Sequence, residues 1–485
     1  MKRFRVFRLV LSLLLIFTAS SCFGQNSQSK VSSFQYLKKL NALFDFIQQY
    51  YVDEVDPKVI YEGAVKGLLD SLEDPYTTYL DVDYLRDLSD TTEGTFGGVG
   101  LSITKPTSNS AEKPAYVEVA YPLATSPGAK AGIQSGDFII AVDDKPTDVM
   151  TMNEVLQNLR GPVGTNVKVT ILRGTNTKFE VTLTRALIEV PTAKYGMIEN
   201  TTIGYVRLIE FTPETPKRLQ DALDLFASKK YTGLIIDLRD NPGGLISSVV
   251  DVADKFIDSG VIVSTKSRIA RENFEYKATK EKTVIKKKMP IIVLINRGSA
   301  SASEILSGAL KDYHLAYLVG ENTYGKGSVQ QVRQLSEQDG FKYTVARYYT
   351  PSDVNIDKVG IPPDLEIINF KEFNEEESKI FVSLNEDKVI ENIAKENPNM
   401  TEEQIASKAK ELSKKYPLEE RIIRRLIRNA VYRNKEDALY DLDYDLQLNA
   451  AIDIIKKGTF NKLMNSTKTL KELQAASKKD VNAKK

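Results

Sequence analysis

The sequence contains almost no histidine and almost no cysteine. Of its 485 residues, one is histidine (His314) and one is cysteine (Cys22). A single cysteine cannot form an internal disulfide. A Ser-His-Asp hydrolase needs an imidazole base, so a hydrolase here would use another group. The chain also lacks an excess of either charge, with 66 Lys and Arg against 65 Asp and Glu. Because nucleic-acid binders usually carry a basic excess, this balance argues against that class.

The first 24 residues have the composition of a bacterial export signal. Four basic residues lie in Met1 to Arg8, and the apolar run from Leu9 to Phe17 is too short to cross a bilayer. We therefore expect an exported protein of the periplasm or cell envelope, with a short membrane anchor as the alternative. The segment Ala-Ser-Ser-Cys22 resembles a bacterial lipoprotein signal. Lipidation at Cys22 and ordinary cleavage after Gly24 both remain open.

Hydrophobic periodicity divides the remaining chain into parts. Residues 25–93 are typical of a helical N-terminal segment, because apolar side chains recur at helical spacing. Residues 94–186 alternate short strands with turn signals and two short helical stretches, as in a small β module. Residues 187–370 alternate strands with helices, and continuous apolar runs such as Ile291 to Ile295 predict an α/β core with strands buried on both faces.

The last part, residues 371–485, is charged and is predicted to be helical. The expected helices are Asn385 to Lys395, Thr401 to Lys415 and Leu418 to Tyr432. Beyond Lys456 the chain is rich in lysine, which favours a solvated and frayed end.

The segment from Asn296 to Gln331 carries the residues best suited to chemistry. Its serines lie between an apolar strand and a helix that starts near Ser301. At such a helix start, unpaired backbone N–H groups can hold an oxyanion beside a serine nucleophile. Taken alone, Ser299, Ser301 and Ser303 also fit helix caps.

Lys326 is the candidate for the missing base. It can accept a proton if burial lowers its pKa enough to leave the amine neutral. The sequence from Gly320 to Gly327 nearly matches a phosphate-binding loop, but Gly327 replaces the required Ser or Thr, and a strand rather than a helix follows. Nucleotide binding is therefore disfavoured.

Upstream, the two glycines of Arg239-Asp-Asn-Pro-Gly-Gly244 allow either a ligand-binding turn or a purely structural one.

Together these segments resemble the C-terminal processing peptidases, also called tail-specific proteases. The resemblance covers roughly Phe34 to Ile368. Four motifs in the family's order carry it: Arg239-Asp-Asn-Pro-Gly-Gly244, Gly298-Ser-Ala-Ser301-Ala-Ser-Glu304-Ile, Thr323-Tyr-Gly-Lys326-Gly-Ser-Val-Gln330 and Gly360-Ile-Pro-Pro-Asp364. It implies an α/β, crotonase-like serine peptidase core, a PDZ domain inserted before it, helical segments at both ends, and no metal or organic cofactor.

The resemblance also implies roles for individual residues. Ser301 would be the nucleophile, and Lys326, 25 residues later, would be the base. Gln330 or Glu304 would support the lysine, and Gln330 is preferred because its side chain could hydrogen-bond the neutral amine and orient it. The oxyanion donors would be the backbone N–H groups of Gly243 or Gly244 and of Ala302.

In the PDZ module, the loop Phe96-Gly97-Gly98-Val99-Gly100-Leu101 would hold a free C-terminal carboxylate. The bound peptide would then add as a strand to the edge of the sheet. Arg160 would have a regulatory role and bridge to the protease core in the active state.

We therefore expect an exported serine endopeptidase that recognises the C-terminal ends of unstructured proteins and cleaves them with a Ser/Lys dyad. Two alternatives remain: a catalytically silent PDZ scaffold that binds protein C-termini, and a relative that acts on non-protein ligands. A homo-oligomer and an envelope lipoprotein adaptor are further candidate partners.

An inserted segment, Asn369 to Asp443, separates the core from Asp445-Leu-Gln-Leu-Asn-Ala-Ala-Ile452. The candidate roles of this segment are dimer contact, adaptor docking and a substrate channel.

Overall fold

The computed structural model describes residues 33–483 except 83, 86–93, 107–113, 124–125, 190–191, 286–288, 370–372 and 433–437. The predicted export signal and Cys22 lie outside these residues. Within the described ranges, no helix is long and apolar enough to cross a membrane. The chain separates into two units, Met1–Tyr79 and Leu80–Lys485.

The described part of the first unit is helical, as predicted. It contains α2 (Ser33–Tyr50) and α3 (Pro57–Asp70). Asp56 caps α3 by accepting a hydrogen bond from the Lys58 N–H at 2.8 Å, and Pro57 favours the first turn because its φ is already helical. Strand β1 (Thr78–Asp81) spans the boundary between the two units.

The PDZ-like module is a small β domain with an open sheet edge. Its main sheet has the order β3-β4-β5-β7-β8, so β3 is an edge strand. The short strands and the two short helical stretches predicted for residues 94–186 are confirmed. The bounds are β2 (Thr95–Gly98), β3 (Leu101–Thr104), β4 (Val117–Pro122), α5 (Pro127–Lys130), β5 (Phe138–Val142), β6 (Lys145–Pro146), α6 (Met152–Leu159), β7 (Asn166–Arg173), β8 (Thr177–Thr184) and β9 (Ala186–Glu189).

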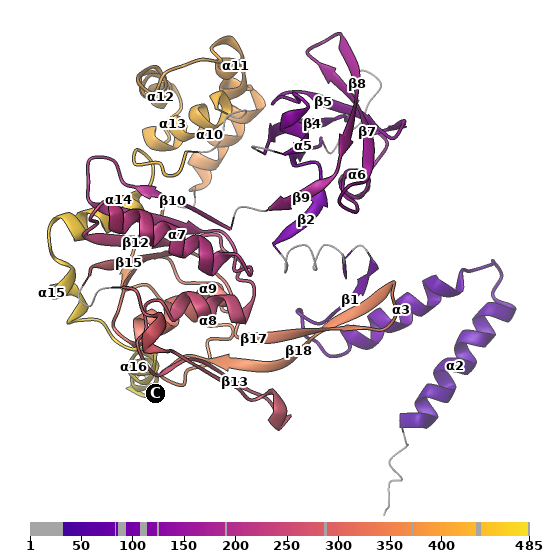
Figure 1. The fold of residues 1–485 in the computed structure, drawn as a ribbon, viewed down its shortest axis with the longest axis horizontal. Helices are drawn as coiled ribbons and strands as arrows, with labels where there is room; N and C mark the ends of the chain where they lie inside the picture. Colours follow the sequence, from indigo (N-terminus) through magenta and orange to yellow (C-terminus); the bar gives the residue numbers. More distant parts are fainter. Residues whose placement is uncertain are drawn as a thin grey trace, which may run out of the picture. The chain divides into compact units, whose positions relative to one another are not determined.

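The peptidase core is a mostly parallel sheet covered by helices on both faces (Figure 1). The sheet order is β10-β11-β12-β15-β16-β19, and only the pairing of β10 with β11 is antiparallel. All residues of β12, β15 and β16 are buried, which confirms the prediction from the apolar runs. The bounds are β10 (Ala193–Met197), β11 (Ile203–Leu208), β12 (Gly233–Asp237), β15 (Ile291–Ile295), β16 (Tyr317–Gly320) and β19 (Leu365–Glu366).

Alternate strand residues point to two separate hydrophobic clusters. Ile236 belongs to the cluster with helices α7 (Thr215–Ser228), α8 (Ile246–Ala253) and α9 (Ala302–Asp312). Ile235 belongs to the cluster with α14 (Leu446–Lys456) and α15 (Phe460–Met464). Because side chains alternate between the faces of a strand, these two clusters lie on opposite sides of the sheet. Residues beyond 445 therefore complete the core.

A second sheet supports the loop that carries Lys326. Strand β18 pairs with β17 and with β13, and β13 pairs with β14. Two short 3-10 helices, η1 and η2, flank β14. The bounds are β13 (Val261–Lys266), η1 (Ala270–Glu272), β14 (Glu275–Lys277), η2 (Lys280–Lys282), β17 (Ser328–Gln334) and β18 (Asp339–Tyr349).

The inserted segment forms four helices with a hydrophobic cluster of their own: α10 (Glu375–Glu386), α11 (Val389–Glu396), α12 (Glu402–Lys415) and α13 (Glu420–Val431). The predicted helix from Asn385 to Lys395 is wrong at its start, because Lys388 has a φ of 51° and separates α10 from α11. The expectation of a frayed end beyond Lys456 is also wrong. Phe460 and Leu470 are buried, and Leu470 opens α16 (Leu470–Ala483).

Candidate active site

Three loops carry the predicted catalytic motifs, and all three leave the carboxyl ends of neighbouring parallel strands. Residues 238–244 follow β12, residues 296–301 follow β15, and residues 321–327 follow β16. Strand β15 pairs in parallel with both β12 and β16. The carboxyl edge of an open α/β sheet is where such folds usually place their sites. The topology therefore collects the three motifs in one place.

The first two loops are hydrogen-bonded to each other in a way that separates the three serines. The Ser299 hydroxyl donates to the Leu238 carbonyl oxygen at 2.7 Å, and the Ser303 hydroxyl donates to the Asn241 carbonyl oxygen at 3.0 Å. Both serines are fully buried, whereas Ser301 is partly exposed. Structural roles thus account for Ser299 and Ser303, and Ser301 is left as the candidate nucleophile.

Ser301 has a backbone conformation that L-amino acids rarely adopt. Its φ is 54° and its ψ is −112°. Such a conformation costs about 1–3 kcal/mol and persists only when the surrounding contacts enforce it. Gly243 lies directly against this residue, since a Cβ atom placed on Gly243 would come within 2.7 Å of the Ser301 Cβ. The double glycine of the first loop is therefore needed to admit the serine.

Glu304 connects the serine to the lysine through their main chains. Its Oε2 accepts hydrogen bonds from the Ser301 N–H and the Lys326 N–H, both at 2.9 Å. Its Oε1 accepts from the Thr323 hydroxyl at 2.6 Å and the Gly325 N–H at 2.7 Å. All four partners are donors, which suits the ionised carboxylate. Burial raises the pKa of Glu304, and the four hydrogen bonds oppose that shift.

The surroundings of Lys326 favour a neutral amine. Burial is the main reason that the pKa of Lys326 lies below its ordinary value. The positive charge of Lys342 lowers this pKa further, while the negative charge of Glu304 raises it. A lysine with a lowered pKa can accept a proton from a nearby hydroxyl and act as a general base.

Two backbone N–H groups beside Ser301 have no hydrogen-bond acceptor among the described residues: those of Gly244 and Ala302. The N–H of Gly243, in contrast, donates to the Asn241 Oδ1 at 2.9 Å. Gly244 has a φ of 133°, and a Cβ atom there would lie 2.2 Å from the Phe211 carbonyl oxygen, so only glycine fits. Of the two predicted glycine donors, Gly244 is the one whose N–H is available.

Gln330 lies on β17, and its side chain is directed to neighbouring hydroxyl groups. Its Nε2 donates to the Ser328 Oγ at 2.8 Å and to the Thr344 Oγ1 at 3.3 Å. Glu304 therefore has the more direct connection to both Ser301 and Lys326 in this structure. The choice between Gln330 and Glu304 as support for the lysine stays a prediction.

The single histidine lies away from these loops. His314 follows the C-terminal end of α9, whereas Ser301 precedes its N-terminal end, and the helix between them is about 16 Å long. The ring Nδ1 of His314 is hydrogen-bonded to the Thr467 hydroxyl at 2.8 Å. His314 is therefore not placed to act on Ser301.

A buried ionic network that the sequence did not predict anchors the first loop. The Arg239 guanidinium donates to both oxygens of Asp237, which is fully buried, and to both oxygens of Asp445 at 2.8 and 2.6 Å. The Arg239 charge holds the pKa of Asp237 below its ordinary value, against the effect of burial. Asp445 also caps α14, so the helix that follows the insertion is tied to the site loops.

Comparison with known proteins identifies the family of this chain. The profile of peptidase family S41 matches residues 202–367, a PDZ domain profile matches residues 118–173, and the profile of the activating protease CtpB N-terminal domain matches residues 17–84. The carboxy-terminal-processing protease of Bartonella bacilliformis is 38% identical over 360 residues, which cover 73% of this chain and 80% of that protein. The chain belongs to peptidase family S41.

Other relatives of this S41 peptidase have similar names. The carboxy-terminal processing protease CtpA of Bacillus subtilis is 34% identical over 346 residues, which cover 71% of this chain and 72% of that protein. Among solved structures, the photosystem II D1 C-terminal processing protease is 29% identical, with a TM-score of 0.41, and the match covers 70% of this chain and 94% of that one. The predicted family, fold class and serine-type peptidase activity are confirmed by the profile matches and the curated relatives.

In the PDZ domain of this S41 peptidase, the segment Phe96 to Leu101, which was predicted to hold a carboxylate, runs from strand β2 to the start of edge strand β3. The carbonyl oxygens of Val99 and Gly100 accept hydrogen bonds from the Gly128 N–H and the Leu123 N–H, both at 2.9 Å. The N–H groups of Val99 and Gly100 have no acceptor in the described part of the chain. A loop whose carbonyl oxygens are hydrogen-bonded within the domain, and whose N–H groups are available, is suited to binding a carboxylate.

The loop also requires its glycines. A Cβ atom on Gly97 would lie 2.1 Å from the Gly161 carbonyl oxygen, and one on Gly100 would lie 2.3 Å from the Ser126 Cβ. Arg160, which ends α6, places its guanidinium over the Phe96 ring at 4.6 Å. Arg160 thus contacts the first residue of the loop, and its predicted bridge to the protease core stays a prediction.

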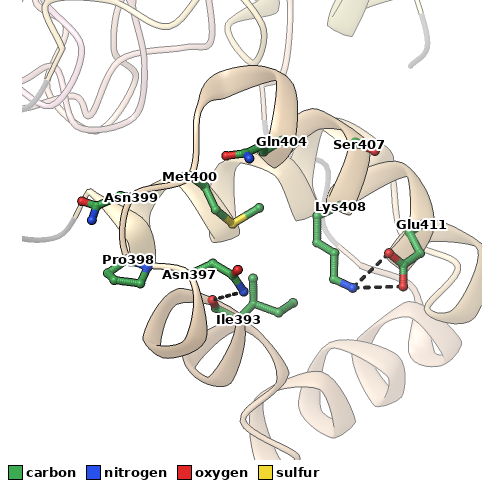
Figure 2. Close-up of a pocket in the computed structure, with 9 residues that line it drawn as sticks. All are labelled: Ile393, Asn397, Pro398, Asn399, Met400, Gln404, Ser407, Lys408 and Glu411. Atoms are coloured by element: carbon green, nitrogen blue, oxygen red, sulfur yellow. Dashed lines mark hydrogen bonds and ion pairs between the residues drawn. The ribbon is translucent and has the colours of Figure 1, made fainter.

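One cavity lies in the inserted helices and contains none of the predicted catalytic residues. The cavity has a volume of about 540 Å³. Figure 2 shows the residues that line it, among them Lys408 paired with Glu411, and the ammonium nitrogen lies 2.9 Å from the carboxylate. Its lining combines a few apolar side chains with mostly polar ones: Ile393, Asn397, Pro398, Asn399, Met400, Gln404, Ser407, Lys408 and Glu411.

Proposed function

We propose that this S41 peptidase is an exported endopeptidase that selects unstructured proteins by their C-terminal ends and cleaves them with a Ser301/Lys326 dyad. The observation that carries the proposal is the shared carboxylate of Glu304, whose Oε2 accepts from the N–H groups of both residues at 2.9 Å. The two main-chain nitrogens are therefore within two hydrogen-bond lengths of each other. Strained Ser301 and partly buried Lys326 have the properties expected of a nucleophile and its base.

The reaction follows from these groups. Neutral Lys326 takes the hydroxyl proton of Ser301, and the alkoxide attacks the peptide carbonyl carbon. The backbone N–H groups of Gly244 and Ala302 stabilise the oxyanion. Protonated Lys326 then gives its proton to the leaving amine as the peptide bond breaks. Water, deprotonated by Lys326, attacks the acyl-enzyme ester on Ser301, and the carboxylic acid product leaves with the serine restored.

Substrate selection is assigned to the PDZ domain. The amides of Val99 and Gly100 receive the terminal carboxylate, and the last residues of the substrate pair with the open edge of β3. Arg160 contacts Phe96, and it would transmit the binding of a substrate C-terminus at this loop to the protease core. Export rests on the N-terminal sequence pattern alone, and oligomeric state and an envelope adaptor stay predictions.

The test uses an unfolded reporter protein whose C-terminus is either free or amidated. Wild type should cleave the free form faster, and Ser301→Ala should cleave neither while keeping the wild-type circular dichroism spectrum. If wild type binds the reporter tail but leaves the chain intact, the silent-scaffold alternative holds. If the free and amidated reporters are cleaved equally, the proposed recognition of C-terminal ends is wrong.

A further inference from the structure

Tyr348 contacts the carbonyl groups of the two residues whose N–H groups are bonded to Glu304. Its hydroxyl lies 2.5 Å from the Lys326 carbonyl oxygen and 3.2 Å from the Ser301 carbonyl oxygen. The side chain comes from β18 and is 1% exposed. Its own N–H donates to the Gly327 carbonyl oxygen at 3.0 Å. One buried phenol thus reaches both of the residues that the proposed mechanism joins.

The two carbonyl groups depend on this phenol to different degrees. The Ser301 carbonyl oxygen also accepts from the N–H groups of Glu304 and Ile305 at 2.9 and 3.0 Å, in the first turn of α9. For the Lys326 carbonyl oxygen, the Tyr348 hydroxyl is the short contact. A hydroxyl has one proton, so the 2.5 Å contact with Lys326 is the main hydrogen bond and the contact with Ser301 is secondary.

We infer that Tyr348 is a positioning residue for the catalytic dyad. Glu304 accepts hydrogen bonds from the N–H groups of Ser301 and Lys326, and the Tyr348 hydroxyl donates toward their carbonyl groups. Each of the two catalytic residues is therefore contacted by Glu304 at its N–H group and by Tyr348 at its carbonyl group. Ser301 has φ and ψ values that persist only under such constraint. The inference rests on the proposed Ser301/Lys326 dyad and adds to it a residue that does not touch the substrate.

Loss of the hydroxyl should act on the lysine more than on the serine. The Lys326 carbonyl would lose its short contact, while the Ser301 carbonyl would keep its two helix bonds. The loop that carries Lys326 would then shift, because the Tyr348 hydroxyl no longer holds the Lys326 carbonyl group in its place. A lysine that moves toward water regains hydration of its charged form, so its pKa should rise toward the ordinary value.

The test compares Tyr348→Phe with Tyr313→Phe. Tyr313 is the matched control, because its hydroxyl also donates to a main-chain carbonyl, that of Val261 at 3.0 Å, but it follows the far end of α9. Cleavage of a short peptide is measured across pH. Tyr348→Phe should lower kcat by about 10-fold to 100-fold, since small misplacements of catalytic groups have effects of this size. KM should stay within about twofold of wild type. The rising limb of the pH profile should move to higher pH, and Tyr313→Phe should change none of these.

A second variant covers the case in which Tyr348→Phe is poorly folded. Replacing Tyr348 with 4-aminophenylalanine keeps a donor at the same position and should restore most of kcat and the wild-type pH profile. The inference is overturned if folded Tyr348→Phe keeps the wild-type kcat and pH profile, or if the amino variant is as impaired as the phenylalanine one. Ser301→Ala is measured in parallel. If Ser301→Ala stays active, the proposed function is wrong; if it is inactive, the results for Tyr348 test the positioning role alone.

Discussion

Replacing Glu304 with glutamine removes the acceptor that joins the two catalytic main chains. The carboxylate accepts four hydrogen bonds, two on each oxygen. A glutamine amide keeps one oxygen, and its NH2 group must face the other pair of donors. The less costly orientation places NH2 toward Thr323, whose hydroxyl can rotate, and leaves the Gly325 N–H without an acceptor.

The size of the effect follows from these contacts. A buried donor without a partner costs about 1–3 kcal/mol, and the remaining bonds lose the added strength of a charged acceptor. We therefore expect Glu304→Gln to lower the free energy of unfolding by about 2–4 kcal/mol. Domains usually have about 5–15 kcal/mol in total, so the variant should stay folded at 25 °C with a lower Tm. Because the Lys326 loop is released, kcat should fall by about 100-fold or more.

Glu321→Gln is the control for this experiment. It makes the same change of charge in the same loop, but Glu321 is only partly buried and its carboxylate has a weak contact, 3.5 Å from the Gln447 Nε2. Thermal unfolding and peptide cleavage are measured for both variants at one pH. The reasoning is refuted if Glu304→Gln unfolds at the wild-type temperature and cleaves at the wild-type rate, or if Glu321→Gln is equally impaired.

Three further predictions concern the histidine, the pH dependence and the oxyanion loop. His314→Gln should keep nearly full activity, because His314 lies beyond the far end of α9 and bonds Thr467; a large loss of kcat in a folded variant would contradict the lysine base. Activity should rise with pH along a limb below the ordinary lysine pKa of about 10.4, since the active amine is neutral and burial lowers its pKa. A rate that falls from mildly acidic to mildly alkaline pH in folded enzyme would refute this. Gly244→Ala should lose most activity and some stability, because its Cβ would meet the Phe211 carbonyl oxygen. Gly174→Ala is the control for backbone strain, because Gly174 has a φ of 64° and no atom lies within 4 Å of the position of its Cβ.

Local sequence pattern predicts the strands that position the candidate site. Continuous apolar runs indicated the buried strands β12, β15 and β16, and the loops after these strands hold the motifs. The serine cluster, however, did not distinguish its members from one another. The hydroxyl groups of Ser299 and Ser303 bond to the loop after β12, about 60 residues earlier in the chain, and this long-range contact separates them from Ser301.

Other parts of the site could not be predicted, because they depend on long-range contacts. Asp445 completes the Arg239 network across 206 residues of sequence, with the inserted helices between them. Tyr348 lies in a strand among other aromatic residues, and no local signal separates its buried hydroxyl from theirs. The lysine-rich tail looked solvated from its composition, yet Phe460 and Leu470 contribute to the two core clusters. These two apolar residues determine how the tail packs, although the average composition of the tail is polar.

The central claim is that a neutral Lys326 is the base for Ser301, and Lys326→Arg tests it most directly. Arginine keeps the positive charge and a long side chain, but it does not lose its proton in proteins and cannot act as a base. Cleavage of a short peptide should be undetectable in Lys326→Arg at every pH at which the enzyme is folded. Lys342→Arg, the control at the neighbouring positive charge, should stay active. Substantial cleavage by folded Lys326→Arg would contradict the account.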